Sequence, residues 1–445
     1  MTFRNLIKNS DLATRRAFVG GLAGSLLGAS VTSAFGPRAI AQSLNNPLAG
    51  DLARGALPRL PGGGRAKSVI YLFLRGGMTH LDTFDPKPGK VTQGPVEALR
   101  TRADGVLVGQ YFPKLAQQMD KVCVVNSMTS RQGAHEQAQY VMRTSYELRG
   151  TIQHPSLGAW CNVEKGRINP TLPGHVLVGG GSDMPTAGFF PPEFQALPIG
   201  SADDGLQNAM LPKGVDEKRF QRRLDQLEKL NSAFGEKHQS RDVAAYSKAY
   251  NEAIKLMRSS DLTAFDLDLE SAAMKQTYGD TPFGSGCLLA RRLVEHGVRY
   301  VEVMSNGWDT HSENFDRLDD LCPSIDQGLA ALLADLDGRG LLEETLVVLA
   351  TEFGRSPDID GDNGRNHYPK AFSCLLAGGG IAGGQRFGKT DAEGREVVED
   401  PVSIQDFNAT IAYACGLPLD KVVTSPSGRP FKVADKGDPI TSIFA

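Results

Sequence analysis

Unbroken apolar runs along the chain predict buried strands of a sheet. The clearest runs are Ser68–Leu74, Val122–Asn126, His175–Val178, Val298–Met304, Leu346–Ala350 and Phe372–Ala377. Runs of this kind, which lack the alternation of half-exposed strands, are typical of strands covered on both faces. The pattern therefore predicts an α/β fold, a doubly wound and mostly parallel sheet with helices on both faces.

Apolar residues between these runs recur at helical spacing. The stretch Leu318–Leu336 repeats leucine or isoleucine every three or four residues and joins the strands at Val298 and Leu346, which makes a β-α-β crossover. Further helices are predicted at 134–144, 154–164, 284–296 and 406–415. Residues 215–260 are densely charged and predict two or three outer helices, an insertion in a single domain that spans 67–445. Internal repeats of 20–50 residues are not visible.

The amino terminus has the pattern of an export signal. The pair Arg15-Arg16 precedes a mild apolar run from Phe18 to Phe35, and Ala39-Ile40-Ala41 offers a small-residue cleavage site. This order predicts a twin-arginine signal peptide at 1–41, a passage through the twin-arginine (Tat) export machinery, and a periplasmic or secreted mature protein. Residues 42–66, rich in proline and glycine, predict a linker or amino-terminal arm. Elsewhere the sequence has no stable membrane span.

Charge and cysteine usage exclude several classes of protein. The net charge of −3 and the pI near 6.3 argue against nucleic acid as a partner. The six cysteines are widely spaced and lack a C-x-x-C pair, so neither a zinc ribbon nor a thioredoxin-like motif is indicated. Because the twin-arginine route exports proteins that folded in the reducing cytoplasm, we expect free, buried cysteines.

Polar residues follow three predicted strands at their carboxyl ends. Ligands of open α/β sheets bind at this edge. Carboxylate and imidazole groups from separate strand exits can converge on one divalent cation, which polarises an ester or carbonyl oxygen and acidifies a bound water. The residues that we predict as metal ligands are Asp309, His311, Glu352 and His367. The alternative is that the histidines are surface groups, that Asp309 caps a turn and that Glu352 pairs with Arg355.

Two further groups of residues suit an anionic ligand. Thr129 and Ser130 precede a predicted helix, whose free N–H groups and dipole favour negative charge, although either hydroxyl could equally be an N-cap. Arg75, Arg355 and Arg365 lie near the strand exits and could clamp an anionic substrate with paired hydrogen bonds. As structural residues, these arginines would instead neutralise the carboxylates.

Five segments resemble a known family, the exported bacterial proteins of the DUF1501 type, which are distantly similar to the alkaline phosphatase and sulfatase superfamily. The segments are Gly76–Pro88, Gly307–His311, Thr351–Arg355, Gly364–Pro369 and Gly378–Gly384. The resemblance covers nearly all of the mature chain. It implies an alkaline phosphatase-like sheet, divalent metals at the carboxyl ends of strands and a hydroxyl or modified cysteine nucleophile at a helix amino terminus.

The resemblance assigns roles to individual residues. It implies Asp309, His311 and His367 as metal ligands, and Ser130 or Thr129, assisted by His135, as the nucleophile. The chain departs from the superfamily where Glu352-Phe353 replaces an Asp-His pair, since Phe353 cannot bind a metal. The metal-binding Asp expected near Arg75 is also missing, and His80 and Asp82 are the substitutes a turn later.

These observations lead to two functional hypotheses. The first is an exported hydrolase of phosphate or sulfate esters, with a small anionic or glycan ester as substrate and a divalent Zn, Mn, Ca or Mg ion as cofactor. The second is a degenerate, non-catalytic family member that binds a ligand, a metal or a partner outside the cytoplasm. Metal content, followed by a screen of aryl phosphates and aryl sulfates as substrates, separates the two hypotheses.

Overall fold

The computed structural model describes residues 63–180, 184, 186–207, 209, 211, 214–237 and 241–445. The predicted signal peptide at 1–41 and most of the predicted linker at 42–66 lie outside the described residues. Within the described part, no helix has both the length and the hydropathy needed to cross a membrane. All six cysteines are buried and free, as expected.

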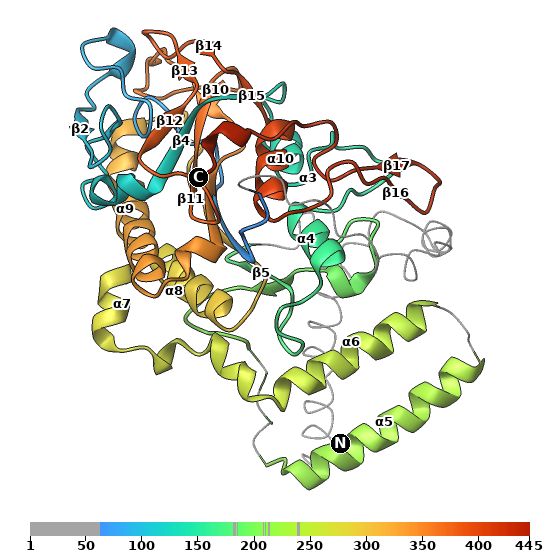
Figure 1. The fold of residues 1–445 in the computed structure, drawn as a ribbon. Helices are drawn as coiled ribbons and strands as arrows, with labels where there is room; N and C mark the ends of the chain where they lie inside the picture. The colour runs from blue at the N-terminus through green and yellow to red at the C-terminus, as the bar shows by residue number, and fades with distance from the viewer. Residues whose placement is uncertain are drawn as a thin grey trace.

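A mixed sheet of nine strands forms the centre of the structure (Figure 1). Its order is β12 (Gln385–Phe387), β4 (Val122–Thr129), β11 (Phe372–Ala377), β8 (Thr345–Ala350), β1 (Ser68–Leu74), β7 (Tyr300–Ser305), β5 (His175–Val178) and β6 (Leu197–Ile199), with β15 (Val402–Ser403) also paired to β4. Only β11 runs antiparallel to its neighbours in this sheet. The predicted α/β fold with a mostly parallel sheet is therefore confirmed.

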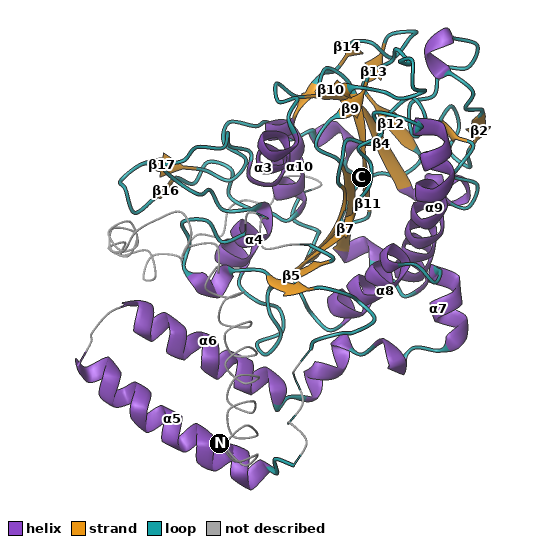
Figure 2. Cartoon of the chain, turned by 180° about the vertical axis from the view of Figure 1, so that it is seen from behind, coloured by secondary structure: helices purple, strands orange, loops and turns teal. Residues whose placement is uncertain are grey.

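Successive residues of β1 point to opposite faces, and both faces are covered. Ile70 and Leu72 join one apolar cluster, whereas Val69 and Phe73 join the other. The first face packs against α7 (Ala272–Tyr278), α8 (Pro282–Glu295) and α9 (Asn314–Gly338), and the second against α3 (His135–Thr144), α4 (Leu157–Lys165) and α10 (Ile404–Ala414), as Figure 2 shows. Burial on both sides explains why the strand sequences are apolar without alternation.

Two helices occupy the charged region predicted to be an insertion. They are α5 (Glu217–Lys237) and α6 (Arg241–Met257), which run side by side away from the sheet (Figures 1 and 2). The described part of α5 is mostly exposed, and its half-buried positions include the apolar Phe220, Leu224 and Leu227. Its charge density thus reflects a solvated surface.

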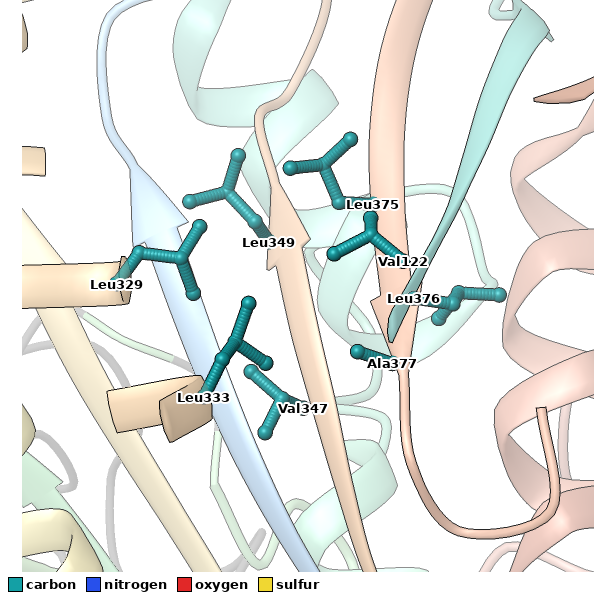
Figure 3. Close-up of a pocket in the computed structure, with 8 residues that line it drawn as sticks. All are labelled: Val122, Leu329, Leu333, Val347, Leu349, Leu375, Leu376 and Ala377. Carbon is teal, nitrogen blue, oxygen red and sulfur yellow. The ribbon is translucent and has the colours of Figure 1, made fainter. Parts of the chain in front are cut away.

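A small apolar cavity lies between α9 and strands β4, β8 and β11. Its volume is about 10 Å³, and its lining consists of Val122, Leu329, Leu333, Val347, Leu349, Leu375, Leu376 and Ala377 (Figure 3). A space of this size is at the lower limit for one water, and a wholly apolar lining offers that water no hydrogen-bond partner. The cavity is a packing gap, so any ligand site must lie elsewhere.

His175 is an ionisable group placed inside the apolar layer between β5 and α4. Its ring packs edge-on against Tyr300, with 4.9 Å between the ring centroids, and Gly158 of α4 lies directly over it. Neither ring nitrogen has a hydrogen-bond partner within the described structure. Burial lowers the pKa of His175 to about 3, and the charge of Arg143 acts in the same direction.

The buried imidazole makes stability depend on pH. The unfolded chain binds a proton at His175 near pH 6.5 and the folded chain only near pH 3, so the free energy of unfolding falls as pH falls between these values. Replacing His175 with Leu should remove about 2 kcal/mol of the loss between pH 7 and pH 5. Urea unfolding of both proteins at the two pH values measures this difference. An equal loss of unfolding free energy between pH 7 and pH 5 in both proteins would contradict a neutral His175 in the folded state.

Candidate metal centre

The carboxyl ends of β4, β7 and β8 lie at the same edge of the sheet, because β4 and β8 both run antiparallel to β11 and β7 and β8 both run parallel to β1. β7 leads to Asp309 and His311, and β4 leads through a short loop to His135, the first residue of α3. β8 leads to β9 (Gly354–Arg355), which pairs antiparallel with β10 (His367–Tyr368) and so returns His367 to the same edge. Three separate strand exits thereby deliver imidazole and carboxylate groups to one place.

Four side chains meet at this edge, and we call His135, Asp309, His311 and His367 the four-residue cluster. One carboxylate oxygen of Asp309 lies 3.2 Å from His311 Nε2 and 3.3 Å from His367 Nε2. The other lies 3.3 Å from His135 Nε2. The structure thus contains a possible His/Asp/His metal site formed by His135, Asp309 and His367, with His311 beside it.

The far nitrogen of each imidazole is held by a hydrogen-bond acceptor. His367 Nδ1 donates to the Gly133 carbonyl at 2.8 Å, His135 Nδ1 to the Glu352 carboxylate at 2.8 Å, and His311 Nδ1 to Asn366 Oδ1 at 3.1 Å. A neutral imidazole that donates from Nδ1 has its lone pair on Nε2. All three lone pairs therefore face the Asp309 carboxylate, and His311 Nε2 and His367 Nε2 are only 2.9 Å apart. Such a set is stable only with a cation or an extra proton between its members.

The cluster has an open side and a closed side. The side chains of Asp309 and His311 are each 47% exposed, whereas those of His135 and His367 are 29% and 25% exposed. The closed side is Phe353, which is fully buried and packs against the rings of His135 and His367 at 4.9 and 4.6 Å between centroids. Phe353 thus forms an apolar floor beneath two of the imidazoles.

Glu352 lies behind His135 and outside the four-residue cluster, and its role as a ligand stays a prediction. It is fully buried, and its Oε1 accepts hydrogen bonds from the Gly76 N–H at 2.9 Å, His135 Nδ1 at 2.8 Å and Gln139 Nε2 at 3.0 Å. The hydrogen bond from His135 to Glu352 raises the pKa of His135. A carboxylate in this position fixes the orientation of an imidazole and increases its basicity. Glu352 is a positioning residue for His135.

Arg355 is fully buried and its donors are used within the protein. Its Nη2 lies 2.5 Å from Asp309 Oδ1 and also donates to the Gly76 carbonyl, and its Nε donates to the Gly77 carbonyl at 2.9 Å. Partial burial acts to raise the pKa of Asp309, but the hydrogen bond and charge of Arg355 outweigh it and lower the pKa to about 2. Arg355 neutralises the Asp309 carboxylate in this structure, as in the alternative considered for it, and its role as a substrate contact stays a prediction.

Gly76 allows the first strand exit to reach this centre. Its φ of +128° is strained for any residue with a side chain, and a Cβ there would lie 2.4 Å from the Asp309 nitrogen. The backbone of the β1 exit can therefore pass directly against the segment that carries Asp309.

Arg365, Asp82 and His80 form a buried structural network instead of a site. Both carboxylate oxygens of Asp82 are paired with Arg365, at 2.8 and 2.9 Å, and all three side chains are fully buried. His80 Nε2 lies 2.8 Å from the Gly394 carbonyl, and burial lowers the pKa of His80 to about 4. The polar atoms of His80 and Asp82 are buried away from the four-residue cluster, and their role as ligands stays a prediction. Arg365 is likewise closed to a substrate.

The predicted hydroxyl groups contact other parts of the chain. Thr129 ends β4 and donates to the Val402 carbonyl at 3.3 Å, and the Ser130 hydroxyl accepts from the Gln132 N–H at 3.1 Å. The N-cap of α3 is Ala134, which has no side-chain cap, so neither hydroxyl is an N-cap. Their role as nucleophile remains a prediction. Arg75, half-buried at the end of β1, likewise remains a predicted substrate contact.

His135 is the cluster member whose role the sequence did not identify. Sequence reasoning placed it near the site as a helper of the nucleophile, whereas the structure places its Nε2 against Asp309. The available signal was its position shortly after a strand of the same sheet, at the start of a helix. Histidines that follow such strands share one edge with the other strand exits.

Residues 66–444 match the family described as protein of unknown function (DUF1501), and the chain belongs to this family. No curated protein matches the sequence. Solved structures that are similar include the lipoteichoic acid synthase LtaP from Listeria monocytogenes, with 8% identity and a TM-score of 0.35 over 83% of this chain and 77% of that one. The PsFucS1 sulfatase from Pseudoalteromonas sp. is 12% identical, with a TM-score of 0.35 over 85% of this chain and 72% of that one. The alkaline phosphatase from the Antarctic bacterium TAB5 is 11% identical, with a TM-score of 0.30 over 71% of this chain and 92% of that one. At these values the likenesses carry no argument about activity.

The network around Asp82 gives a test of its structural role. Replacing Asp82 with Asn should lower the free energy of unfolding by about 3–5 kcal/mol, because the guanidinium of Arg365 stays buried without its counter-charge. Chemical denaturation measures the change. Asp358→Asn, which breaks an ion pair between Arg395 and a carboxylate that is 74% exposed, is the control and should cost far less. Equal losses would contradict the structural assignment of Asp82.

Proposed function

We propose that the four-residue cluster binds one divalent metal ion, and that the protein is an exported, metal-dependent hydrolase of phosphate or sulfate esters. The observation that carries the proposal is the convergence of three imidazole lone pairs on the Asp309 carboxylate, each imidazole being held by an acceptor at its other nitrogen. Metal-bound histidines generally donate their second N–H to a carboxylate or a carbonyl.

The donor set and its spacing fit a transition metal. Ligands of a tetrahedral zinc ion, at about 2.0–2.1 Å from the metal, are roughly 3.3 Å from one another. The three contacts between imidazoles and Asp309 measure 3.2–3.3 Å. Imidazole nitrogen suits Zn²⁺ and its transition-metal neighbours, whereas Ca²⁺ and Mg²⁺ prefer oxygen. Of the ions considered from sequence, Zn²⁺ is the best candidate.

The chemistry of the centre suits an anionic ester. A divalent ion bound here would polarise an ester oxygen and lower the pKa of a water. Asp309 and Glu352 supply two negative charges and Arg355 one positive charge, so a divalent ion leaves an excess of one positive charge. The exposed side chains of Asp309 and His311 lie where a substrate would approach, with Arg75 at a neighbouring strand exit. The paired arginines near the amino terminus support a place outside the cytoplasm.

A second function rests on the number of protein ligands. Four side chains meet in the cluster, and four protein ligands can fill a tetrahedral ion and leave no position for substrate, as in structural zinc sites. In that case the protein binds metal without turnover. His311 decides between the two functions, because it is the most exposed of the three imidazoles and the one outside the compact His135–Asp309–His367 group.

Metal binding is the first test. The protein purified without chelator should bind one equivalent of Zn²⁺, and His135→Ala, Asp309→Ala and His367→Ala should each weaken binding at least tenfold, since each removes a ligand. Competition with a chromophoric chelator measures the affinity. His296→Ala, which alters a half-buried histidine at the end of α8, is the control and should retain it. Full affinity in the cluster variants would show that the ligands were wrongly identified.

Turnover is the second test and separates the two functions. The zinc-loaded protein should hydrolyse an aryl phosphate or an aryl sulfate faster than the metal-free protein. Asp309→Ala should lower the rate of hydrolysis at least a hundredfold, because it removes a ligand and leaves Arg355 without its carboxylate partner. If the protein is a hydrolase, His311→Ala should keep zinc bound and change the rate of ester hydrolysis. Tight zinc binding without turnover of either ester would instead support the binding function.

A further inference from the structure

One face of α3 carries a polar stripe that runs from the cluster into the core. His135, Gln139 and Arg143 are spaced four residues apart, so their side chains lie along the same face of the helix. His135 and Gln139 both donate to Glu352. Arg143, one turn further on, is 3% exposed and is directed into the layer between α3 and the sheet.

Arg143 has a second buried carboxylate as its partner. Its Nε donates to Glu302 Oε1 at 2.6 Å, and Glu302, on β7, is 4% exposed. The guanidinium also lies over the ring of Phe73, 4.1 Å from the centroid, and its Nη2 is 2.9 Å from Met304 Sδ. Its Nη1 has no hydrogen-bond partner within the described part of the chain. The pair is thus fully desolvated and imperfectly satisfied.

A buried ion pair of this kind is not explained by stability alone. Desolvation of two charges offsets most of their attraction, and apolar residues of similar volume often give an equal or greater stability. What a buried charge pair offers is direction, because its hydrogen bonds fix the relative position of two elements more strictly than apolar contacts do. In this structure the two elements are α3 and β7.

The same two elements are joined again at the cluster. α3 carries His135 at its start, and the segment that leaves β7 carries Asp309, whose carboxylate lies 3.3 Å from His135 Nε2. The eight residues from His135 to Arg143 correspond to about 12 Å of helix. Two directional contacts at that separation define both the rotation and the depth of α3 against the sheet.

We propose that Arg143 and Glu302 form a positioning pair for the metal centre, acting through α3 to hold His135 against Asp309. This role rests on the proposed function, since it assumes that His135 is a ligand. The hydrogen bonds of His135 and Gln139 to Glu352 tie α3 to the β8 exit, whereas Arg143 and Glu302 tie it to β7, the strand that leads to Asp309. The opposite side of the helix packs on α10, where Asn408 donates to the Met142 carbonyl at 2.9 Å. That contact lies near the end of α3 that is remote from His135 and does not reach the sheet.

The test compares two buried arginines of the chain. In the cobalt-substituted protein, Arg143→Met should weaken metal binding about 10–100-fold and shift the visible absorption bands of Co²⁺, as loss of a supporting residue does. Arg291→Met is the matched control. Arg291 is 1% exposed and pairs with Glu270 and Asp335 at 2.8 and 2.9 Å, on the face of the sheet that carries α8. Its loss should reduce the temperature of unfolding without moving the Co²⁺ spectrum or affinity.

A second variant covers the case in which Arg143→Met fails to fold. The double variant Arg143→Met/Glu302→Leu leaves no unpaired buried charge and should regain stability but keep the altered Co²⁺ spectrum. Arg143→Lys, which retains the charge, should restore part of the affinity. A folded single or double variant with wild-type affinity and spectrum overturns the positioning role and leaves the metal site intact. A wild-type protein that binds neither Zn²⁺ nor Co²⁺ overturns the proposed function, and this role with it.

Discussion

The buried carboxylate of Glu352 is the point on which the carboxyl edge of the sheet depends. One of its oxygens accepts hydrogen bonds from the β1 exit and from two side chains of α3, while the residue itself continues from β8. An ionised carboxylate without such partners could not be placed in the interior, because its desolvation would cost several kcal/mol. The three donors therefore have to be present together, which fixes β1, β8 and α3 relative to one another.

Charge compensation then determines which groups of the centre remain reactive. Arg355 satisfies Asp309 from the buried side, and Arg365 satisfies Asp82 completely, so neither guanidinium has donors left for a ligand. The imidazoles differ, because each has its Nδ1 held by an acceptor outside the cluster while its Nε2 faces the other cluster members. The charged residues after the strands thus form two groups, a buried network of ion pairs and a partly exposed cluster. In the cluster, the Nε2 atoms are turned toward the Asp309 carboxylate.

Glu352 and Phe353, the two residues that follow Thr351 after β8, have hydrogen-bonding and packing roles beside the cluster. Phe353 removes one potential ligand and packs beneath two imidazoles, and Glu352 becomes the residue that orients His135. His135, from the other end of the site, supplies the imidazole that the strand exit lacks. The described cluster is consistent with one metal position.

The sequence by itself determined strands β1, β4, β5, β7, β8 and β11 of the central sheet, several of the helices and the edge at which chemistry is possible. The run Ser68–Leu74 predicts β1 in full, because a strand buried on both faces must be apolar at every position, and the same reasoning locates β8. Apolar residues at helical spacing locate α9. The sequence also placed Asp309, His311 and His367 at one edge.

Only the tertiary structure decided which charged residues are turned inward. Glu352 and His80 have ligand chemistry in the sequence, but their partners are more than 200 residues away along the chain. The direction of β11 and the approach of His135 to Asp309 depend on similarly distant contacts. The local sequence pattern shows whether a side chain is apolar. The partner of a buried charged side chain depends on which distant segment the fold brings next to it.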